Sequence, residues 1–202
     1  MNELRHDLQV IASLVTGGSR VLDIGCGEGD LLTALVKEKG VDGRGIEIDA
    51  PLVYAAIAKG LSVVQGDIEE DLPHYPDNSF DYVVSSSTLQ AMQDPKGMLQ
   101  QMVRIGKKAI VSVPNFGHWK NRLYLGIKGK MPMTKKLSYT WYETPNIHFC
   151  TITDFVELCN QMGLVIEKRI FIGDDGKTGL IHGKGFFSNL FGEQGVFLIR
   201  EK

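Results

Sequence analysis

The first segment that could bind a small molecule is residues 21–30, VLDIGCGEGD, in which a short β-branched run that ends at Ile24 is followed by Gly25. It carries Asp23 and the three glycines Gly25, Gly27 and Gly29. Glycine lets a backbone turn sharply and approach a ligand without a Cβ atom in the way. A helix that begins after such a turn also offers free N–H groups. The segment therefore predicts a ligand-binding turn; the alternative is a tight turn that binds nothing.

A carboxylate lies at the end of the second predicted strand, in the segment Gly45-Ile46-Glu47-Ile48-Asp49. Glu47 comes about 20 residues after the glycine turn, where a carboxylate accepts hydrogen bonds from both hydroxyls of a ribose. The alternative is a solvated charge at a strand end. Asp49 is expected to cap the following helix rather than to bind ligand.

A third carboxylate, Asp67, follows the third predicted strand in Gln65-Gly66-Asp67-Ile68. It could accept a hydrogen bond from the exocyclic amine of an adenine, with Ile48 and Ile68 packed on the two faces of the ring. Two further residues complete the predicted pocket. Cys26 is interpreted as a small residue of a crowded turn, not as a nucleophile, and Ser85 is expected to line the pocket at the end of the fourth strand.

The order of the glycines decides between nucleotide-binding classes. A dinucleotide-binding turn reads Gly-x-Gly-x-x-Gly, whereas this one reads Gly-x-Gly-x-Gly, and the lysine motif of a phosphate-binding loop is absent. The set formed by the glycine turn, Glu47 and Asp67 instead resembles the class I S-adenosylmethionine-dependent methyltransferases. The resemblance includes Phe80-Asp81-Tyr82-Val83-Val84 as the fourth strand and covers most of the chain. It implies S-adenosylmethionine or S-adenosylhomocysteine as the ligand.

No catalytic residue is assigned. Methyl transfer depends mainly on positioning, which can contribute roughly 7–11 kcal/mol, and a general base is needed only for a protonated nucleophile. His118, beside Trp119, is interpreted as a packed or loop-fixing residue, and His148 resembles a position that orients the next helix in many methyltransferases. The candidates for lining an acceptor pocket are Ser85, Thr88, Gln90, Asn115, His118, Tyr142 and His148.

Alternating strand and helix patterns surround these residues. Strands are predicted at 20–24, 43–48, 61–65, 79–85, 107–113, 164–172 and 195–200, and helices at 4–15, 30–39, 50–59, 96–103 and 151–162. Such alternation favours an α/β fold with a mostly parallel sheet and helices on both faces. We therefore expect a Rossmann-like methyltransferase fold of about seven strands. The last two strands, with no helix between them, should form an antiparallel edge pair.

Two segments interrupt this rhythm within one predicted domain, residues 1–202. Residues 114–150 are an insert rich in aromatic and basic side chains, and residues 173–195 are rich in glycine. Long loops without secondary structure are uncommon unless they have a function. Aromatic residues and arginine are enriched at the cores of protein interfaces. The insert is interpreted as a lid over the pocket or as a surface for a partner protein, and the two roles are compatible.

Composition excludes several other classes. The net charge of -2 and the absence of a wide basic stripe argue against nucleic acid as a partner. Three cysteines without paired spacing predict neither a disulfide framework nor a metal site. No apolar run is long enough to cross a membrane, and the N-terminal segment lacks the apolar core of a signal peptide. We expect a cytoplasmic protein.

Several more distinctive sequence segments indicate a narrower family. They are Thr88-Leu89-Gln90-Ala91, Met92-Gln93-Asp94-Pro95, Val113-Pro114-Asn115-Phe116-Gly117-His118-Trp119, Met131-Pro132, and Trp141-Tyr142-Glu143-Thr144-Pro145-Asn146-Ile147-His148. Together with residues 21–30, they closely resemble the bacterial methionine biosynthesis protein MetW family. The resemblance implies a methyltransferase-like protein associated with homoserine O-acetyltransferase and with the acylation step of methionine synthesis.

Three functions remain open from the sequence, because a fold does not dictate an activity. The first is an accessory or regulator of methionine biosynthesis that binds S-adenosylmethionine or its demethylated product. The second is an active methyltransferase on a small acceptor, and the third is a non-catalytic scaffold with a vestigial pocket. Neither the acceptor nor the oligomeric state is indicated.

Overall fold

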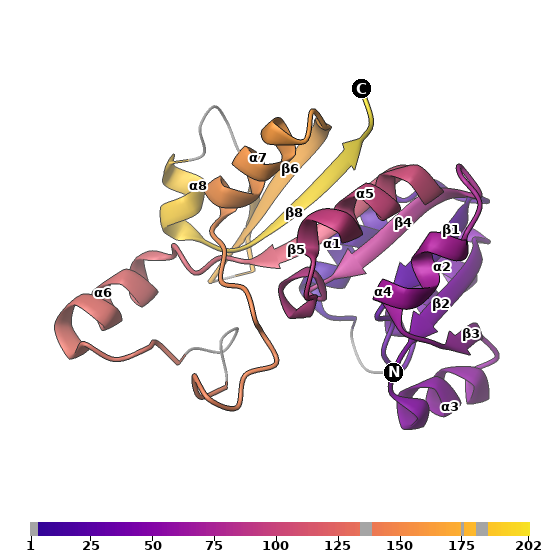
Figure 1. The fold of residues 1–202 in the computed structure, drawn as a ribbon, viewed down its shortest axis with the longest axis horizontal. Coiled ribbons are helices and arrows are strands. Elements are labelled where there is room, and N and C mark those ends of the chain that lie inside the picture. The colour runs from indigo at the N-terminus through magenta and orange to yellow at the C-terminus, as the bar shows by residue number, and fades with distance from the viewer. Residues whose placement is uncertain (1–3, 134–138, 175, 181–185) are drawn as a thin grey trace.

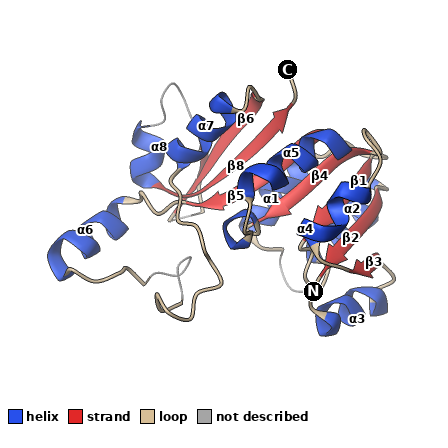
Figure 2. Ribbon diagram, in the orientation of Figure 1, coloured by secondary structure: helices blue, strands red, loops and turns tan. Residues whose placement is uncertain are grey.

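A computed structural model describes residues 4–133, 139–174, 176–180 and 186–202, and Figure 2 shows its helices and strands. The strands form one sheet in the order β3-β2-β1-β4-β5-β8-β6-β7. Their bounds are β1 Arg20–Ile24, β2 Asp42–Glu47, β3 Ser62–Gln65, β4 Phe80–Ser86, β5 Gly106–Pro114, β6 Val165–Gly173, β7 Thr178–Leu180 and β8 Gly192–Arg200.

The sheet is parallel from β3 to β5 and antiparallel from β5 to β7. The predicted fold class, including the antiparallel edge, is confirmed. The described sheet has eight strands rather than about seven because the three-residue β7 pairs with the outer side of β6. From β1 the chain moves outward to β3 and then returns to β4. The strand order therefore reverses between β1 and β4, where ligands bind in open α/β sheets.

Helices cover both faces of the sheet (Figure 1). One face carries α1 and α2, which pack on β1, β4 and β8, while α3 packs with α2 beside β3. The other face carries α4, α5 and α7. The helix bounds are α1 His6–Leu14, α2 Asp30–Lys39, α3 Ala50–Ala58, α4 Ile68–Asp71, α5 Pro95–Ile105, α6 Trp119–Lys128, α7 Ile152–Gln161 and α8 Phe186–Phe191, with 3-10 turns at Leu72–His74 and Leu89–Ala91.

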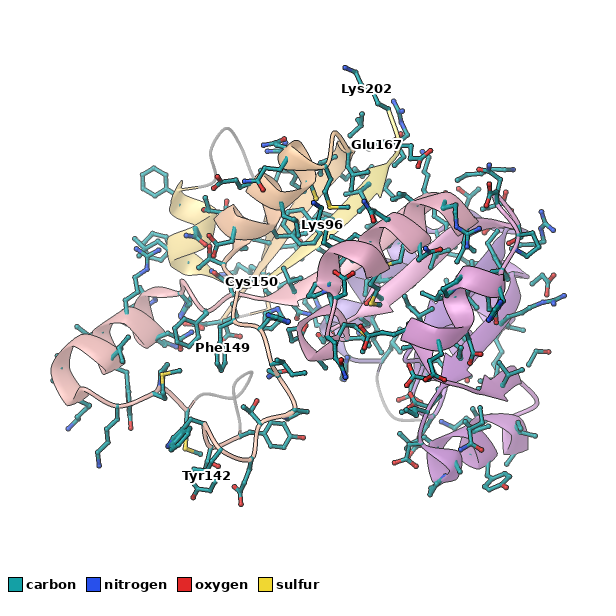
Figure 3. The ribbon with its side chains drawn as sticks, viewed as in Figure 1. Lys96, Tyr142, Phe149, Cys150, Glu167 and Lys202 are labelled. Atoms are coloured by element: carbon teal, nitrogen blue, oxygen red, sulfur yellow. The ribbon has the colours of Figure 1, made fainter. Side chains whose placement is uncertain are left out.

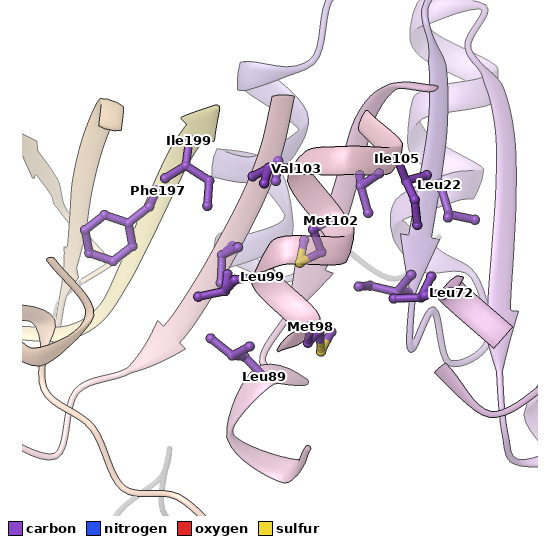
Figure 4. Close-up of a cluster of buried hydrophobic side chains, with 14 of the residues drawn as sticks. Leu22, Leu72, Leu89, Met98, Leu99, Met102, Val103, Ile105, Phe197 and Ile199 are labelled. Atoms are coloured by element: carbon purple, nitrogen blue, oxygen red, sulfur yellow. The ribbon is translucent and has the colours of Figure 1, made fainter. Parts of the chain in front are cut away.

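The larger core is built around α5, as Figure 4 shows. Met98, Leu99 and Met102 recur at helical spacing and are buried to 4% exposure or less. They place the helix between Leu22 of β1 and Leu89 of the 3-10 turn that follows β4. Burying a large apolar side chain contributes about 1.5–3 kcal/mol. This packing fixes the segment that follows β4, which adjoins the glycine turn.

The two predicted interruptions contain secondary structure. The insert includes α6, which extends away from the sheet (Figure 1). The glycine-rich segment 173–195 contains β7, α8 and the start of β8, while residues 175 and 181–185 lie outside the described residues. The sequence patterns did not predict α6, β7 or α8. Helix α6 was missed because its apolar side chains do not face the core: Asn121 is the buried residue of this helix.

Candidate functional site

The glycine turn joins β1 to α2 in a left-handed backbone conformation. Gly25, Gly27 and Gly29 have φ angles of 70°, 56° and 76°, a region that residues with a Cβ atom rarely occupy. The N–H groups of Gly25 and Cys26 both donate to the carbonyl oxygen of Ile46, at 2.8 and 3.2 Å. The turn is therefore tied to β2 as well as to its own strand.

The three glycines differ in what surrounds them. A Cβ atom added at Gly25 would lie 2.7 Å from Thr88 Oγ1, and one at Gly29 would lie 2.2 Å from Leu61 Cδ1. These two glycines make room for side chains of the protein itself. Apart from its two chain neighbours, a Cβ atom at Gly27 would meet no atom of the described residues within 4 Å. Gly27 is therefore the glycine of this turn that presents bare backbone to open space.

Glu47 is held against this open part of the turn. Its Oε2 accepts from the Gly27 N–H at 2.8 Å, and its Oε1 accepts from the Ile48 and Asp49 N–H groups at 2.9 and 3.1 Å. The residue is 8% exposed. A carboxylate offers about four acceptor positions, so this one keeps capacity for a hydroxyl donor. Glu47 is therefore in direct contact with the glycine turn, and its predicted role as an acceptor for ribose hydroxyls remains a prediction.

Asp23 lies beneath the turn with 3% exposure. Burial, and secondarily the nearby Glu47 carboxylate, raise the pKa of Asp23 to about 7. The cause is that desolvation and like charge both disfavour the ionised form. Both effects favour the protonated form of Asp23 and so reduce the negative charge that it adds to the site.

Cys26 behaves as a packing residue. A Cβ atom at Gly45 would lie 2.6 Å from Cys26 Sγ, so the sulfur fills the space that Gly45 leaves. Burial, followed by the carboxylates of Asp23 and Glu47, raises the pKa of Cys26 to about 12. Since the thiolate is the reactive form, this thiol is a poor nucleophile at neutral pH. The geometry agrees with its interpretation as a small residue in a crowded turn.

The residues predicted to hold an adenine ring lie at the ends of β2 and β3. Asp67 caps α4, where its Oδ1 accepts from the Glu69 N–H at 2.9 Å. Ile48 is 61% exposed and has surface to offer a ligand, whereas Ile68 is 6% exposed and belongs to the core. The stacking of an adenine between the two isoleucines remains a prediction, and Ile48 is the more exposed of the two side chains.

Ser85 lies in β4 between Ile24 of β1 and Val111 of β5. It is fully buried, and its Oγ has no hydrogen-bond partner among the described residues. A buried hydroxyl without a partner is uncommon. Its part in a pocket remains a prediction.

The two histidines discussed from the sequence have structural contacts. His118, 3% exposed, is the N-cap of α6, where its Nδ1 accepts from the Lys120 N–H at 3.4 Å. Burial lowers the pKa of His118. The backbone N–H of His148 donates to the Gln90 carbonyl oxygen at 3.0 Å. Asp49 occupies the N-cap position of α3 as expected, although its side chain makes no capping hydrogen bond.

The sequence did not reveal a buried polar cluster that joins α1 to the strand ends. Gln194 Nε2 donates to Ser112 Oγ at 3.1 Å and to Ser87 Oγ at 3.2 Å, and it lies 3.5 Å from Asp7 Oδ2. Asp7 and Gln194 are 3% and 1% exposed. The one available signal was an aspartate among the apolar residues of the first helix.

The described ranges contain no group of three or more His, Cys, Asp or Glu side chains that could hold a metal ion. Within the same ranges, no helix has the length and apolar character needed to cross a membrane.

Residues 5–199 match the sequence profile described as methionine biosynthesis protein MetW. The chain belongs to the MetW family. A MetW-named relative is the bifunctional methionine biosynthesis protein MetXA/MetW of Rhodopirellula baltica, 33% identical over 177 residues. The alignment covers 83% of this chain but 28% of that protein, so the MetW chain corresponds to a minor part of the bifunctional relative.

Solved structures of other proteins share the fold of this chain. A SAM-dependent methyltransferase from Thermotoga maritima is 22% identical with a TM-score of 0.67, and the match covers 98% of this chain and 88% of that one. The [4+2]-cyclase SpnF is 16% identical with a TM-score of 0.66, over 99% of this chain and 85% of its own. Since one of these proteins is a methyltransferase and the other a [4+2]-cyclase, the likeness establishes the fold of this chain and not its chemistry.

Proposed function

We propose that this chain is a cytoplasmic, S-adenosylmethionine-binding protein of methionine biosynthesis that acts as an accessory or regulator of homoserine O-acetyltransferase. The assignment of this ligand rests on the contact between the Glu47 carboxylate and the Gly27 N–H, at the point where the strand order reverses. It gives a fixed acceptor for hydroxyl groups beside open backbone. Membership of the MetW family supports a role in methionine biosynthesis.

The residues around this contact fit a nucleoside that carries an amino-acid tail. Glu47 would accept from the ribose hydroxyls, and the exposed Ile48 would pack on the adenine. Asp67 would accept from the exocyclic amine through the carboxylate oxygen that α4 does not use. S-adenosylmethionine would supply an activated methyl group, while S-adenosylhomocysteine would occupy the same contacts without one.

The bifunctional relative supports homoserine O-acetyltransferase as the partner, because its name joins MetXA and MetW in one chain. A surface suited to a partner lies on the insert. Leu123 and Ile127 of α6 are 52% and 69% exposed, and Trp141 in the same insert is 71% exposed. Apolar side chains exposed together mark interaction surfaces. We propose that α6 and residues 139–149 contact the acetyltransferase.

Regulation requires the ligand to bind the free and partner-bound states with different affinities. The test is the rate of homoserine acetylation by the acetyltransferase from the same organism, with and without this chain and S-adenosylmethionine. We expect the chain to change the rate and the ligand to alter that change. The Glu47→Ala variant should retain the first effect and lose the second. An acetyltransferase unaffected by the chain, with or without ligand, would contradict the proposal.

A further inference from the structure

A groove of about 610 Å³ lies over β2 and β3 and reaches the amino ends of β1 and β4, on the face of the sheet that carries α4 and α5. Residues 66–79, which join β3 to β4, form the four-residue α4 and a 3-10 turn, and these are too short to cover β3. Val64 of β3 is 54% exposed on this face, whereas Val63 packs with α3 and is 8% exposed. None of the lining residues belongs to the predicted cofactor site.

Two exposed arginines line this groove. Arg44 of β2 is in register with Leu22 of β1, and Arg20 stands two positions before Leu22. Since side chains alternate between the two faces along a strand, Arg20 and Arg44 lie on the same face of the sheet. Among the described residues, neither guanidinium forms a hydrogen bond or an ion pair. The groove thus gathers two positive charges without a counter-ion.

The acidic residues near these arginines do not neutralise them. Asp81 Oδ1 accepts from Lys107 Nζ at 2.8 Å, and its Oδ2 accepts from the backbone N–H of Arg20 at 2.9 Å. Asp71 is the carboxylate of the groove lining, and within the described ranges it forms no ion pair with either arginine. Two guanidiniums against one carboxylate leave the lining with a net attraction for an anion.

The floor of the groove is apolar. Ile46 and Phe80 are 0% and 5% exposed and form its base, and Val64 extends it toward the edge of the sheet. A ligand that covered Val64 would gain about 25 cal/mol for each Å² of apolar surface removed from water. The groove therefore suits a molecule with an apolar body as well as a charge.

The wall opposite β3 is held in place by Arg104 of α5. Its Nη1 donates to the Tyr75 carbonyl oxygen at 2.8 Å, and its Nη2 donates to the Leu72 carbonyl oxygen at 3.0 Å. Burial, followed by the Asp71 carboxylate, raises the pKa of Tyr75, so its hydroxyl remains a neutral donor. A fixed wall reduces the ordering that a ligand would otherwise have to impose.

This groove is separate from the surface proposed for the acetyltransferase. Figure 3 shows Tyr142 and Phe149 on the insert, at the opposite end of the molecule from α3 and β3. The lining contains no residue of the insert.

We propose that this groove binds a small organic anion, whose phosphate or carboxylate contacts Arg20 and Arg44 and whose apolar body lies on Val64. A guanidinium presents its N–H donors in a planar fork that matches the oxygens of either group. Drug-sized ligands occupy pockets of about 300–1,000 Å³, and the groove falls within this range. The inference does not rest on the proposed function of the glycine turn.

Three naphthalene compounds test this inference. 1-Naphthyl phosphate and 1-naphthoate carry the two kinds of anion, while 1-naphthol has the same rings and is uncharged at neutral pH. Each is titrated calorimetrically into the full chain at low ionic strength, in a buffer without phosphate. We expect at least one anion to bind about 10-fold more tightly than 1-naphthol, as a hydrogen bond to a charged group implies. Binding of neither anion, or equally tight binding of 1-naphthol, would overturn the inference.

Excess S-adenosylhomocysteine separates the groove from the glycine turn. The anion should bind with the same affinity in its presence and absence, whether or not S-adenosylhomocysteine itself binds. Displacement of the anion would place it at the glycine turn and contradict the groove.

Variants locate the anion on the groove. Arg20→Gln and Arg44→Gln should each weaken it about 3- to 12-fold, a modest loss because both guanidiniums are exposed to solvent. Val64→Glu should weaken it further by like charge, and all three positions are exposed, so the variants should fold. Lys37→Gln removes the same charge from an exposed position of α2, on the other face of the sheet, and should bind as the wild type does. Unchanged affinity in both arginine variants, or equal weakening in Lys37→Gln, would contradict the site.

Discussion

Glu47 and Asp23 show how two neighbouring carboxylates acquire different roles. Glu47 accepts three backbone N–H groups, whereas Asp23 is buried beneath the turn and its pKa is raised. Strand ends and spacing were enough to predict both positions, because these are local features of the chain. The sequence could not show that Gly25 and Gly29 face Thr88 and Leu61, since those contacts join distant segments.

The raised pKa of Asp23 predicts a pH-dependent stability. Its pKa is about 7 in the folded protein and 3.8 for an ordinary aspartate, so the folded state binds more protons between pH 4 and 7. The free energy of unfolding should therefore fall as pH rises through this range, by at most on the order of 4 kcal/mol, and then level off. Urea unfolding at several pH values measures this slope, which Asp23→Asn should largely remove. A slope that persists unchanged in the variant would rule out Asp23 as its source.

The contact between Cys26 and Gly45 predicts a specific coupling. Gly45→Ala should destabilise the protein by about 1–3 kcal/mol, because its new Cβ atom would overlap Cys26 Sγ. In the Cys26→Ala background the same substitution should cost less, since the sulfur is gone. Chemical denaturation of the four proteins gives the coupling energy. Strictly additive effects would show that the sulfur does not fill this space.

At the scale of elements, α2 and α6 mark the limits of prediction. The sequence predicts α2 over residues 30–39, and the structure has α2 at Asp30–Lys39, because its leucines repeat at helical spacing and Gly40 ends it. The apolar side chains of α6 also recur at helical spacing, but little of their surface is buried against the sheet. A pattern tied to core burial predicts the first kind of helix and misses the second.

The exposed aromatic residues of the insert should serve partner binding. Trp119→Ala and Trp141→Ala should weaken association with homoserine O-acetyltransferase more than they weaken binding of S-adenosylhomocysteine. Tyr54→Ala is a matched control, because Tyr54 is 69% exposed on α3, outside the insert. Surface plasmon resonance and calorimetry measure the two affinities. The reverse order of effects would make the insert a lid over the pocket.

At the scale of the whole molecule, the long-range strand order was the least predictable feature. The sequence indicated an antiparallel pair from the last two long strands, and β6 and β8 do pair. It did not indicate that β8 lies between β5 and β6. Local patterns define each strand, but the neighbours of a strand depend on contacts between segments far apart in the chain.

Asn115 joins several of these distant segments. Its Nδ2 donates to the Asn189 and Gly192 carbonyl oxygens, at 2.8 and 2.7 Å, and its Oδ1 accepts from the Gly117 and Ile152 N–H groups, at 3.0 and 3.3 Å. Because all of these groups would lose a partner, Asn115→Ala should destabilise the protein by roughly 3 kcal/mol.

Thermal or urea unfolding of Asn115→Ala checks this prediction. Asn160→Ala, at an exposed position of α7, is the control and should change stability by about 0.5 kcal/mol or less. Similar stability of the two variants would show that Asn115 does not hold the base of the insert to β8 and α7.

The most direct test of the proposed function is calorimetric titration of the ligand-stripped protein with S-adenosylhomocysteine. We predict binding at micromolar affinity or tighter, weakened by roughly 10- to 150-fold in Glu47→Ala, because hydrogen bonds to a charged group contribute about 1.5–3 kcal/mol. Glu28→Ala, in the same turn but paired with Lys59 at the surface, should bind nearly as well as the wild type. Absence of binding, or equal affinities for wild type and Glu47→Ala, would contradict the assignment of this pocket.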